Sequence, residues 1–155
     1  MVEQSLSKQF KINPSQLNAY STGLLQGKAY SRMHTLLSHT LSRFGISVPE
    51  WKLLGQLHEN DKIRLSEIAS LLSYDPPMVT KLVKGLEKKG LLKRISDKND
   101  ERAKTVIVSV KGNQLILEIE PEVKKTMANI LKGVNREDLI TYIKVLGLIV
   151  DNTEE

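Results

Sequence analysis

Apolar residues recur at steps of three and four along both ends of the chain. Over residues 17–44 they fall on one stripe of an α-helix, which Gly23 and Gly27 could interrupt. A second stripe covers residues 112–134, where Pro121 predicts a kink or a split because proline cannot donate the helical hydrogen bond. The pattern therefore predicts long amphipathic helices at both ends of the chain.

Capping residues indicate further helices between and after these stripes. Residues 47–50, Ser-Val-Pro-Glu, resemble a capping box and open a helix. A short helix is predicted over residues 66–72, followed by a tight turn. Asp75 can then cap a helix over residues 76–89, and Asn135 can cap a last helix that continues to about residue 151. Two helices joined by so short a turn are typical of a helix-turn-helix.

After the second of these helices the apolar period changes from 3.6 toward two. Residues 91–96 and 104–110 are rich in Val, Ile and Leu and predict two short strands, joined by a polar loop. A hairpin directly after a helix-turn-helix forms a wing. The sequence therefore predicts a mainly α fold with a small β-hairpin, a winged helix-turn-helix over residues 47–110.

Length and composition limit the class of protein. The 155 residues correspond to a single domain, 1–155, of globular composition. The absence of cysteine excludes disulfides and thiolate metal sites. No apolar run approaches the ~20 residues that a membrane span needs, and the first residues lack the apolar segment of a secretion signal. We therefore expect a cytoplasmic protein without membrane contact.

The net charge of +5 is concentrated in one part of the sequence. Residues 81–104 hold nine basic against four acidic side chains, and the rest of the chain is balanced. Such an excess is the expected mark of a surface that binds polyanions. The predicted recognition helix, residues 76–89, would lie in the major groove of DNA, and the wing, residues 91–110, at the minor groove. The alternatives are a merely solvated lysine-rich surface, or a winged-helix adaptor that binds protein.

The outer face of the predicted recognition helix supplies candidate base contacts. Lys81 and Lys84 can donate to guanine, and the methyl group of Thr80 can touch a thymine methyl. Contact with phosphate alone is the alternative for Lys84 and Lys88. In the wing, Arg102 is the best candidate for the minor groove, because narrow A·T-rich grooves attract arginine.

The order of these motifs resembles the MarR family of bacterial transcription regulators, from about Leu17 to Val150. The most specific part is the run MVTKLVKGLEKKGLLKRISDKNDERAKTVIVSV, followed by KGNQL. It contains the family's helix end LEKKGL, a strand arginine at Arg94, and an Asp-x-Arg wing at Asp100 and Arg102. The resemblance implies that Asp100 orients Arg102 or pairs with Arg94.

The resemblance also implies a function and an assembly. It implies a homodimer held by helices 17–44 and 112–151, which binds a palindromic operator, acts as a repressor and is released by a small-molecule effector. Together, the predicted DNA-binding residues are Thr80, Lys81, Lys84, Lys88, Arg94, Lys98, Asn99, Asp100 and Arg102. Such a protein would be associated with the nucleoid. Pro76 and Pro77 depart from the family at the start of the recognition helix, and the two lost backbone donors should weaken anion binding there.

Other chemistry finds little support in the sequence. Tyr20, Met33, His34 and Trp51 could line a ligand pocket, although such residues at helical spacing can equally be plain core. The spacing of His34, His39 and His58 fits no local metal-binding pair, so no metal is expected. No nucleophile triad or nucleotide-binding fingerprint is present, so we expect neither an enzyme nor a cofactor.

Overall fold

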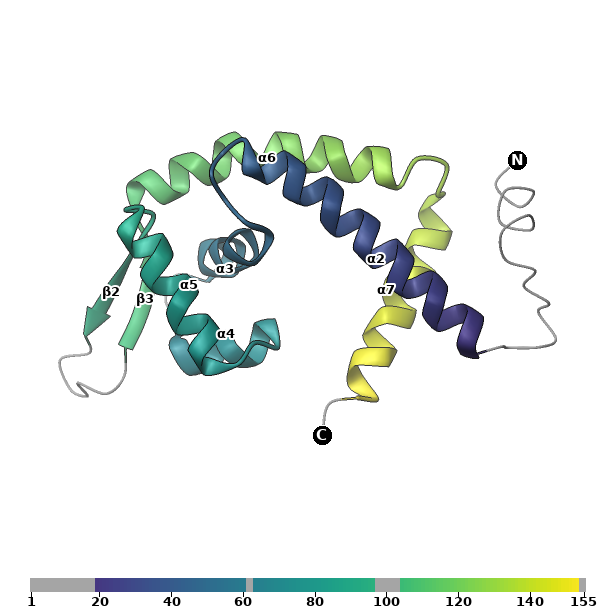
Figure 1. Ribbon diagram of the computed structural model, residues 1–155, viewed down its shortest axis with the longest axis horizontal. Helices are drawn as coiled ribbons and strands as arrows, with labels where there is room; N and C mark the ends of the chain where they lie inside the picture. The colour runs from purple at the N-terminus through teal and green to yellow at the C-terminus, as the bar shows by residue number, and fades with distance from the viewer. Residues whose placement is uncertain (1–18, 61–62, 97–103, 154–155) are drawn as a thin grey trace. The chain divides into compact units, whose positions relative to one another are not determined.

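The computed structural model describes residues 19–60, 63–96 and 104–153 (Figure 1). Its elements are α2 (Ala19–Ser42), α3 (Val48–Glu59), β1 (Ile63–Arg64), α4 (Leu65–Leu72), α5 (Pro76–Lys88), β2 (Leu92–Ser96), β3 (Lys104–Val108), α6 (Val110–Ile130) and α7 (Arg136–Asp151). The chain forms two compact units, Ala29–Thr126 and the combination of Met1–Lys28 with Met127–Glu155. The predicted mainly α fold with a small β wing is confirmed.

The sheet has three strands rather than the predicted two. Strand order is β1-β3-β2, and both pairings are antiparallel. Val106 in the central strand lies opposite Arg94 of β2 on one side and Ile63 of β1 on the other. The two residues of β1 are too few to produce an alternating pattern, so only pairing with β3 defines them as a strand.

The core of the Ala29–Thr126 unit is built by every element of that unit. Because α3, α4 and α5 each direct one apolar stripe inward, their side chains meet those of the sheet and of α6. The buried apolar residues are Leu41, Ile46, Val48, Leu53, Leu54, Leu57, Ile63, Ile68, Val79, Val83, Leu86, Leu91, Leu92, Val106, Ile116 and Ile119. This core fixes the orientation of α5 with its other face outward.

The start of α6 is attached closely to the wing. The hydroxyl of Ser109 donates to the carbonyl oxygen of Gly90 at 2.7 Å and accepts from the backbone N–H of Gly112 at 3.0 Å. Gly112 is buried, and a β-carbon on it would collide with the carbonyl oxygen of Leu91 and lie 2.7 Å from a methyl carbon of Val108. Glycine is therefore required where α6 crosses the strands.

The long helices differ from the sequence prediction in two ways. Gly23 and Gly27 do not interrupt α2, which is continuous over 24 residues. Pro121 does not split α6, which runs from Val110 to Ile130 rather than over residues 112–134. Pro121 and Leu117 are both exposed, so water can bond the Leu117 carbonyl that proline leaves without a donor.

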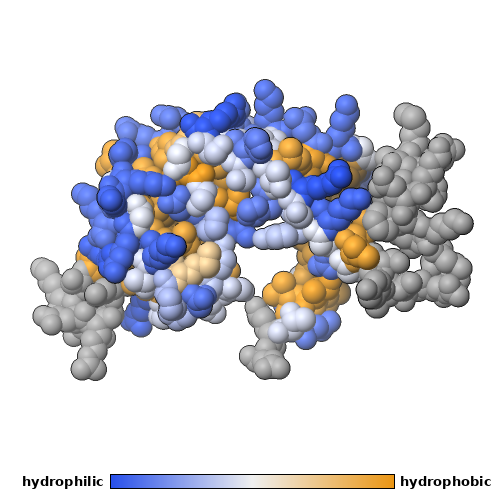
Figure 2. Space-filling view, in the orientation of Figure 1, coloured by the Kyte–Doolittle hydropathy of each residue, from blue (hydrophilic) through white to orange (hydrophobic). Residues whose placement is uncertain are grey.

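Helix α7 begins as predicted but buries little. Asn135 is its N-cap, with its side-chain oxygen accepting from the N–H of Asp138 at 2.8 Å. None of its residues is buried, and apolar side chains are visible over this helix in Figure 2. The large exposed apolar residues of α7 are Ile140, Tyr142, Ile143, Val145, Leu148, Ile149 and Val150.

Candidate nucleic-acid interface

A tight turn connects α4 to α5 and fixes the start of α5. Ser73 ends α4 in the left-handed conformation, with φ 51°. Asp75 is the N-cap of α5, as predicted, and its carboxylate accepts from the N–H of Met78 at 2.7 Å. Pro76 and Pro77 have no N–H to offer. The first turn of α5 therefore has no backbone donor free for a phosphate.

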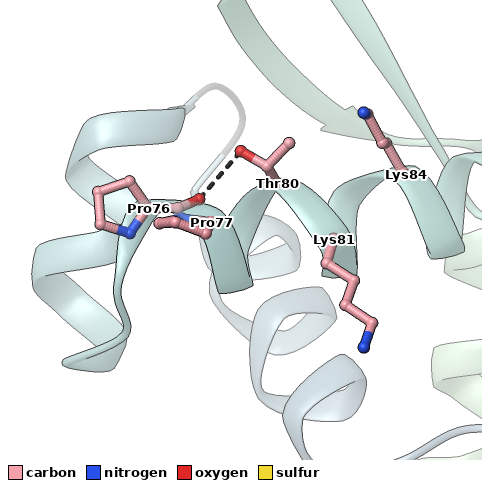
Figure 3. Close-up of a pocket in the computed structure, with 5 residues that line it drawn as sticks. All are labelled: Pro76, Pro77, Thr80, Lys81 and Lys84. Carbon is pink, nitrogen blue, oxygen red and sulfur yellow. Dashed lines mark hydrogen bonds between the residues drawn. The ribbon is translucent and has the colours of Figure 1, made fainter.

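The two faces of α5 differ as the sequence predicts. Val79, Val83 and Leu86 are buried in the core. The side chains of Thr80, Lys81, Lys84 and Lys88 are exposed on the other face, and no hydrogen bond or ion pair with any described residue holds the three ammonium groups. A surface hollow lies on this face, lined by Pro76, Pro77, Thr80, Lys81 and Lys84 (Figure 3).

Lys89, although next in sequence to Lys88, is occupied within the protein. Its ammonium group donates to the carbonyl oxygen of Gly45 and to the carboxylate of Glu50, each at 2.8 Å. Glu50 also accepts from the N–H of Ser47 at 2.9 Å, which completes the predicted capping box of α3. The lysines left available on α5 are therefore those of its outer face.

Burial and hydrogen bonding act in opposite directions on Glu50. Burial alone would raise the pKa of this carboxyl, but hydrogen bonds from Lys89 and Ser47 outweigh it and hold the pKa below its ordinary value. Glu50 is thus an ionised group inside the Ala29–Thr126 unit, where its bond to Lys89 links α3 to the end of α5.

Arg94 connects β2 to α5. Its guanidinium donates to the carboxylate of Glu87 at 2.7 Å, and its side chain is only 24% exposed. The Nε of Arg94 is buried and has no hydrogen-bond partner among the described residues. The interaction with Glu87 was not predicted from the sequence, because the sequence does not show which residues of a helix and a strand will face each other. A direct contact between Arg94 and DNA stays a prediction.

The tip of the wing lies outside the described residues. The predicted contacts Lys98, Asn99, Asp100 and Arg102 all fall there. The structure brings Thr80, Lys81 and Lys84 together around one hollow and positions Lys88 further along the same helix.

The four predicted ligand-pocket residues are not seen to line a common pocket in the described part of the chain. Trp51 is half-buried and packs against the core of the Ala29–Thr126 unit. Met33 and His34 are half-buried on α2, where the His34 ring lies 6.0 Å from that of Tyr30. The side chain of Tyr20 lies outside the described part of the chain. A pocket formed by these residues stays a prediction.

Two kinds of feature are absent from the described residues. No three His, Asp or Glu side chains are grouped so that they could hold a metal ion. Likewise, none of the helices in the described ranges has the length and apolar character to cross a bilayer.

A short helix, a capped turn, an outward basic helix and a sheet with a projecting hairpin define a winged helix-turn-helix protein. Residues 46–104 match the model of the MarR family. The resemblance of the sequence to the MarR family is thereby confirmed, and this is a family of transcription regulators rather than enzymes.

Solved structures agree with this fold. A mutant MarR from E. coli complexed with operator DNA superposes with a TM-score of 0.77 at 22% identity, covering 82% of this chain and 91% of that one. A MarR-family transcriptional regulator from Rhodococcus sp. RHA1 gives 0.79 at 20% identity, covering 90% and 99%. BpsR of Bordetella bronchiseptica, whose DNA binding is regulated by 6-hydroxynicotinic acid, gives 0.76 at 19% identity, covering 83% and 98%.

Proposed function

We propose that this protein is a sequence-specific, double-stranded DNA-binding transcription regulator. The observation that carries the proposal is the outer face of α5, beside the strands of a wing, where three exposed lysines have no partner among the residues that the structure describes. A helix is narrow enough to enter the ~12 Å major groove, and cations around it would neutralise the flanking phosphates. The E. coli MarR bound to operator DNA, which shares the fold, supports this reading.

The proposal includes the finer features that the sequence predicts. Helix α5 is the recognition helix, and the wing reaches the minor groove with Arg102. The protein acts as a homodimer on a palindromic operator, with residues 47–110 as the DNA-binding lobe and helices 17–44 and 112–151 as the dimerisation region. The uncovered apolar side chains of α7 support self-association. Its place of action is then the nucleoid of the cytoplasm.

A small-molecule effector that releases a repressor completes the proposal. The regulation of BpsR by 6-hydroxynicotinic acid supports an effector in this fold. Tyr20, Met33, His34 and Trp51 are the candidate contacts for it. A panel of metabolites that release bound DNA, repeated with Trp51→Ala, would test that assignment.

A salt titration tests DNA binding itself. Duplexes selected by the protein from its source genome would be titrated between 50 and 200 mM salt. If the dimer contacts six to ten phosphates, affinity should fall by ~10³–10⁵ over this range. A complete absence of binding at every salt concentration would favour the protein-binding adaptor instead.

Charge variants identify the surface involved. Lys84→Gln should reduce the slope of log affinity against log salt by about 2, because one phosphate contact, worth ~0.9, is lost in each half-site. Lys125→Gln removes the same charge from an exposed position on α6 and serves as the control. Equal slopes for both variants would show that α5 does not face the DNA.

A further inference from the structure

The exposed face of α5 has an apolar end. The hollow at its first turns is formed by two proline rings, the methyl group of Thr80 and the methylene stems of Lys81 and Lys84 (Figure 3). The lysines end in charges, but the surface between them is mostly apolar. Pro76, Pro77 and Thr80 are all exposed, so the hollow is open to a partner from outside.

Thr80 offers a methyl group rather than a hydrogen-bond donor. Its hydroxyl donates to the carbonyl oxygen of Pro76 at 2.9 Å, one helical turn earlier. A hydroxyl has a single proton, so Thr80 cannot also donate to a guanine or to the O4 atom of a thymine. The methyl group remains available on the outer side.

The backbone around the hollow also lacks donors. Pro76 and Pro77 have none, and the N–H of Met78 is taken by Asp75 at 2.7 Å. The nearest donors are therefore the ammonium groups of Lys81 and Lys84, at the ends of long side chains. For a base that presents acceptors, this end of α5 therefore offers only the lysine ammonium groups as donors, beside the apolar surface of the hollow.

We propose that this hollow receives the 5-methyl group of a thymine, so that α5 selects thymine at that position by apolar contact. The inference rests on the proposed DNA-binding function. Thymine alone among the four bases carries a methyl group in the major groove. The positive charges of Lys81 and Lys84 beside the hollow complement the phosphates that flank any base in a duplex. The hollow thus combines an apolar surface for the thymine methyl with flanking positive charges for the phosphates.

Uracil substitution tests the proposal at the level of single methyl groups. A duplex selected by the wild-type protein from random sequences would be resynthesised with deoxyuridine replacing each thymine in turn, which removes only the methyl. We expect affinity to fall about fourfold per buried methyl, at one or two positions of each half-site and not elsewhere. A duplex whose every thymine tolerates uracil would overturn the proposal.

Two variants of Thr80 distinguish the methyl from the hydroxyl. Thr80→Ser keeps the hydroxyl and loses the methyl, so it should bind thymine and uracil duplexes equally. Thr80→Val keeps a methyl and loses the hydroxyl, so it should retain the fourfold preference for thymine. The opposite result, with preference kept in Thr80→Ser and lost in Thr80→Val, would show that the oxygen reads the base and that the proposal is wrong. Because Thr80 is exposed, unchanged thermal unfolding is expected for both.

The failure of this inference and that of the proposed function are distinguishable. Salt-dependent binding without any difference between thymine and uracil overturns the inference alone. A wild-type protein that selects no duplex at all overturns the proposed function, and the inference with it.

Discussion

In α5, Val79, Val83 and Leu86 are at most 2% exposed, whereas Ile143 and Leu148 of α7 are each 59% exposed. Both helices carry apolar residues at helical spacing, and both begin at an acidic or amide N-cap. The difference is that α3, α4 and the sheet cover α5, while α7 has no buried residue. The same pattern in sequence has therefore led to two different environments.

This difference shows which surfaces a single chain completes by itself. Because the core of the Ala29–Thr126 unit satisfies the apolar face of α5, the outer face is left for charged side chains. Exposed apolar area is unfavourable by about 25 cal/mol per Å², and a continuous patch of it on a helix marks a protein interface. We therefore expect the surface of α7 to be buried in an assembly.

The largest expected effect is on self-association. Ile143→Asp would place a charge in the apolar surface of α7, and burying an unpaired charge is costly. We expect dimerisation to weaken by at least ~100-fold, with a parallel loss of operator affinity, measured by sedimentation equilibrium and by DNA binding.

Lys144→Ser is the matched control for this change. Lys144 is an exposed neighbour on the same helix, and its removal should leave the association constant within about twofold. If the Ile143→Asp protein sediments as the wild type does, the apolar surface of α7 is not buried in an assembly, and the explanation given for its difference from α5 is wrong.

The next effect concerns the packing between the start of α6 and the strands of the wing. In Gly112→Ala the new β-carbon would meet backbone and Val108, and such overpacking costs about 1–3 kcal/mol. Gly55→Ala in α3 meets no atom within 4 Å, and alanine in a helix should instead stabilise by about 0.5–1 kcal/mol. Urea unfolding of the two variants should thus show changes of opposite sign; destabilisation of similar size in both would contradict the tight crossing at Gly112.

The smallest expected effect is the loss of stability when the buried carboxylate of Glu50 is replaced. Glu50→Gln should lower the free energy of unfolding by about 1–2 kcal/mol at pH 7, because two charge-assisted hydrogen bonds weaken. The pKa of Glu50 is lowered on folding, so its stabilising contribution is present above the ordinary pKa of a glutamate and is lost as the pH falls through the lower folded value.

The pH dependence supplies the check on Glu50. Denaturation of wild type and Glu50→Gln would be compared at pH 7 and at successively lower pH. The gap between them should narrow below about pH 4.3, the ordinary pKa of glutamate. A gap that is constant or that widens on acidification would show that the carboxylate is not stabilised in the way described.

Local signals in the sequence located most of the fold correctly. The predicted N-caps Ser47, Asp75 and Asn135 are all confirmed. Each side chain accepts a hydrogen bond from the N–H three residues later, so the interaction depends only on the local sequence. Gly90, just after the end of α5, adopts the left-handed conformation, with φ 74°. Helix α2 is not interrupted at Gly23 and α6 is not split at Pro121, because a long helix tolerates a weak residue when its neighbours continue the hydrogen bonding.

The candidate site was predicted less completely. The exposed face with Thr80, Lys81 and Lys84 follows from helical periodicity alone. Strand β1 and the ion pair between Glu87 and Arg94 depend on how separate elements face each other, and no periodicity contains that information. The role of Ser109 in joining α6 to the wing was missed for the same reason.

The sequence by itself determined where the capped helices α3, α5 and α7 begin, which helix faces are apolar, and that the positive charge lies in residues 81–104. Only the tertiary structure decided which of those charges is available. Lys89 is held by Glu50, 39 residues away, while Lys84 has no partner among the described residues. Helix caps and periodicity arise from hydrogen bonds and side-chain directions within one turn, whereas the availability of a lysine depends on which distant residues folding brings to it.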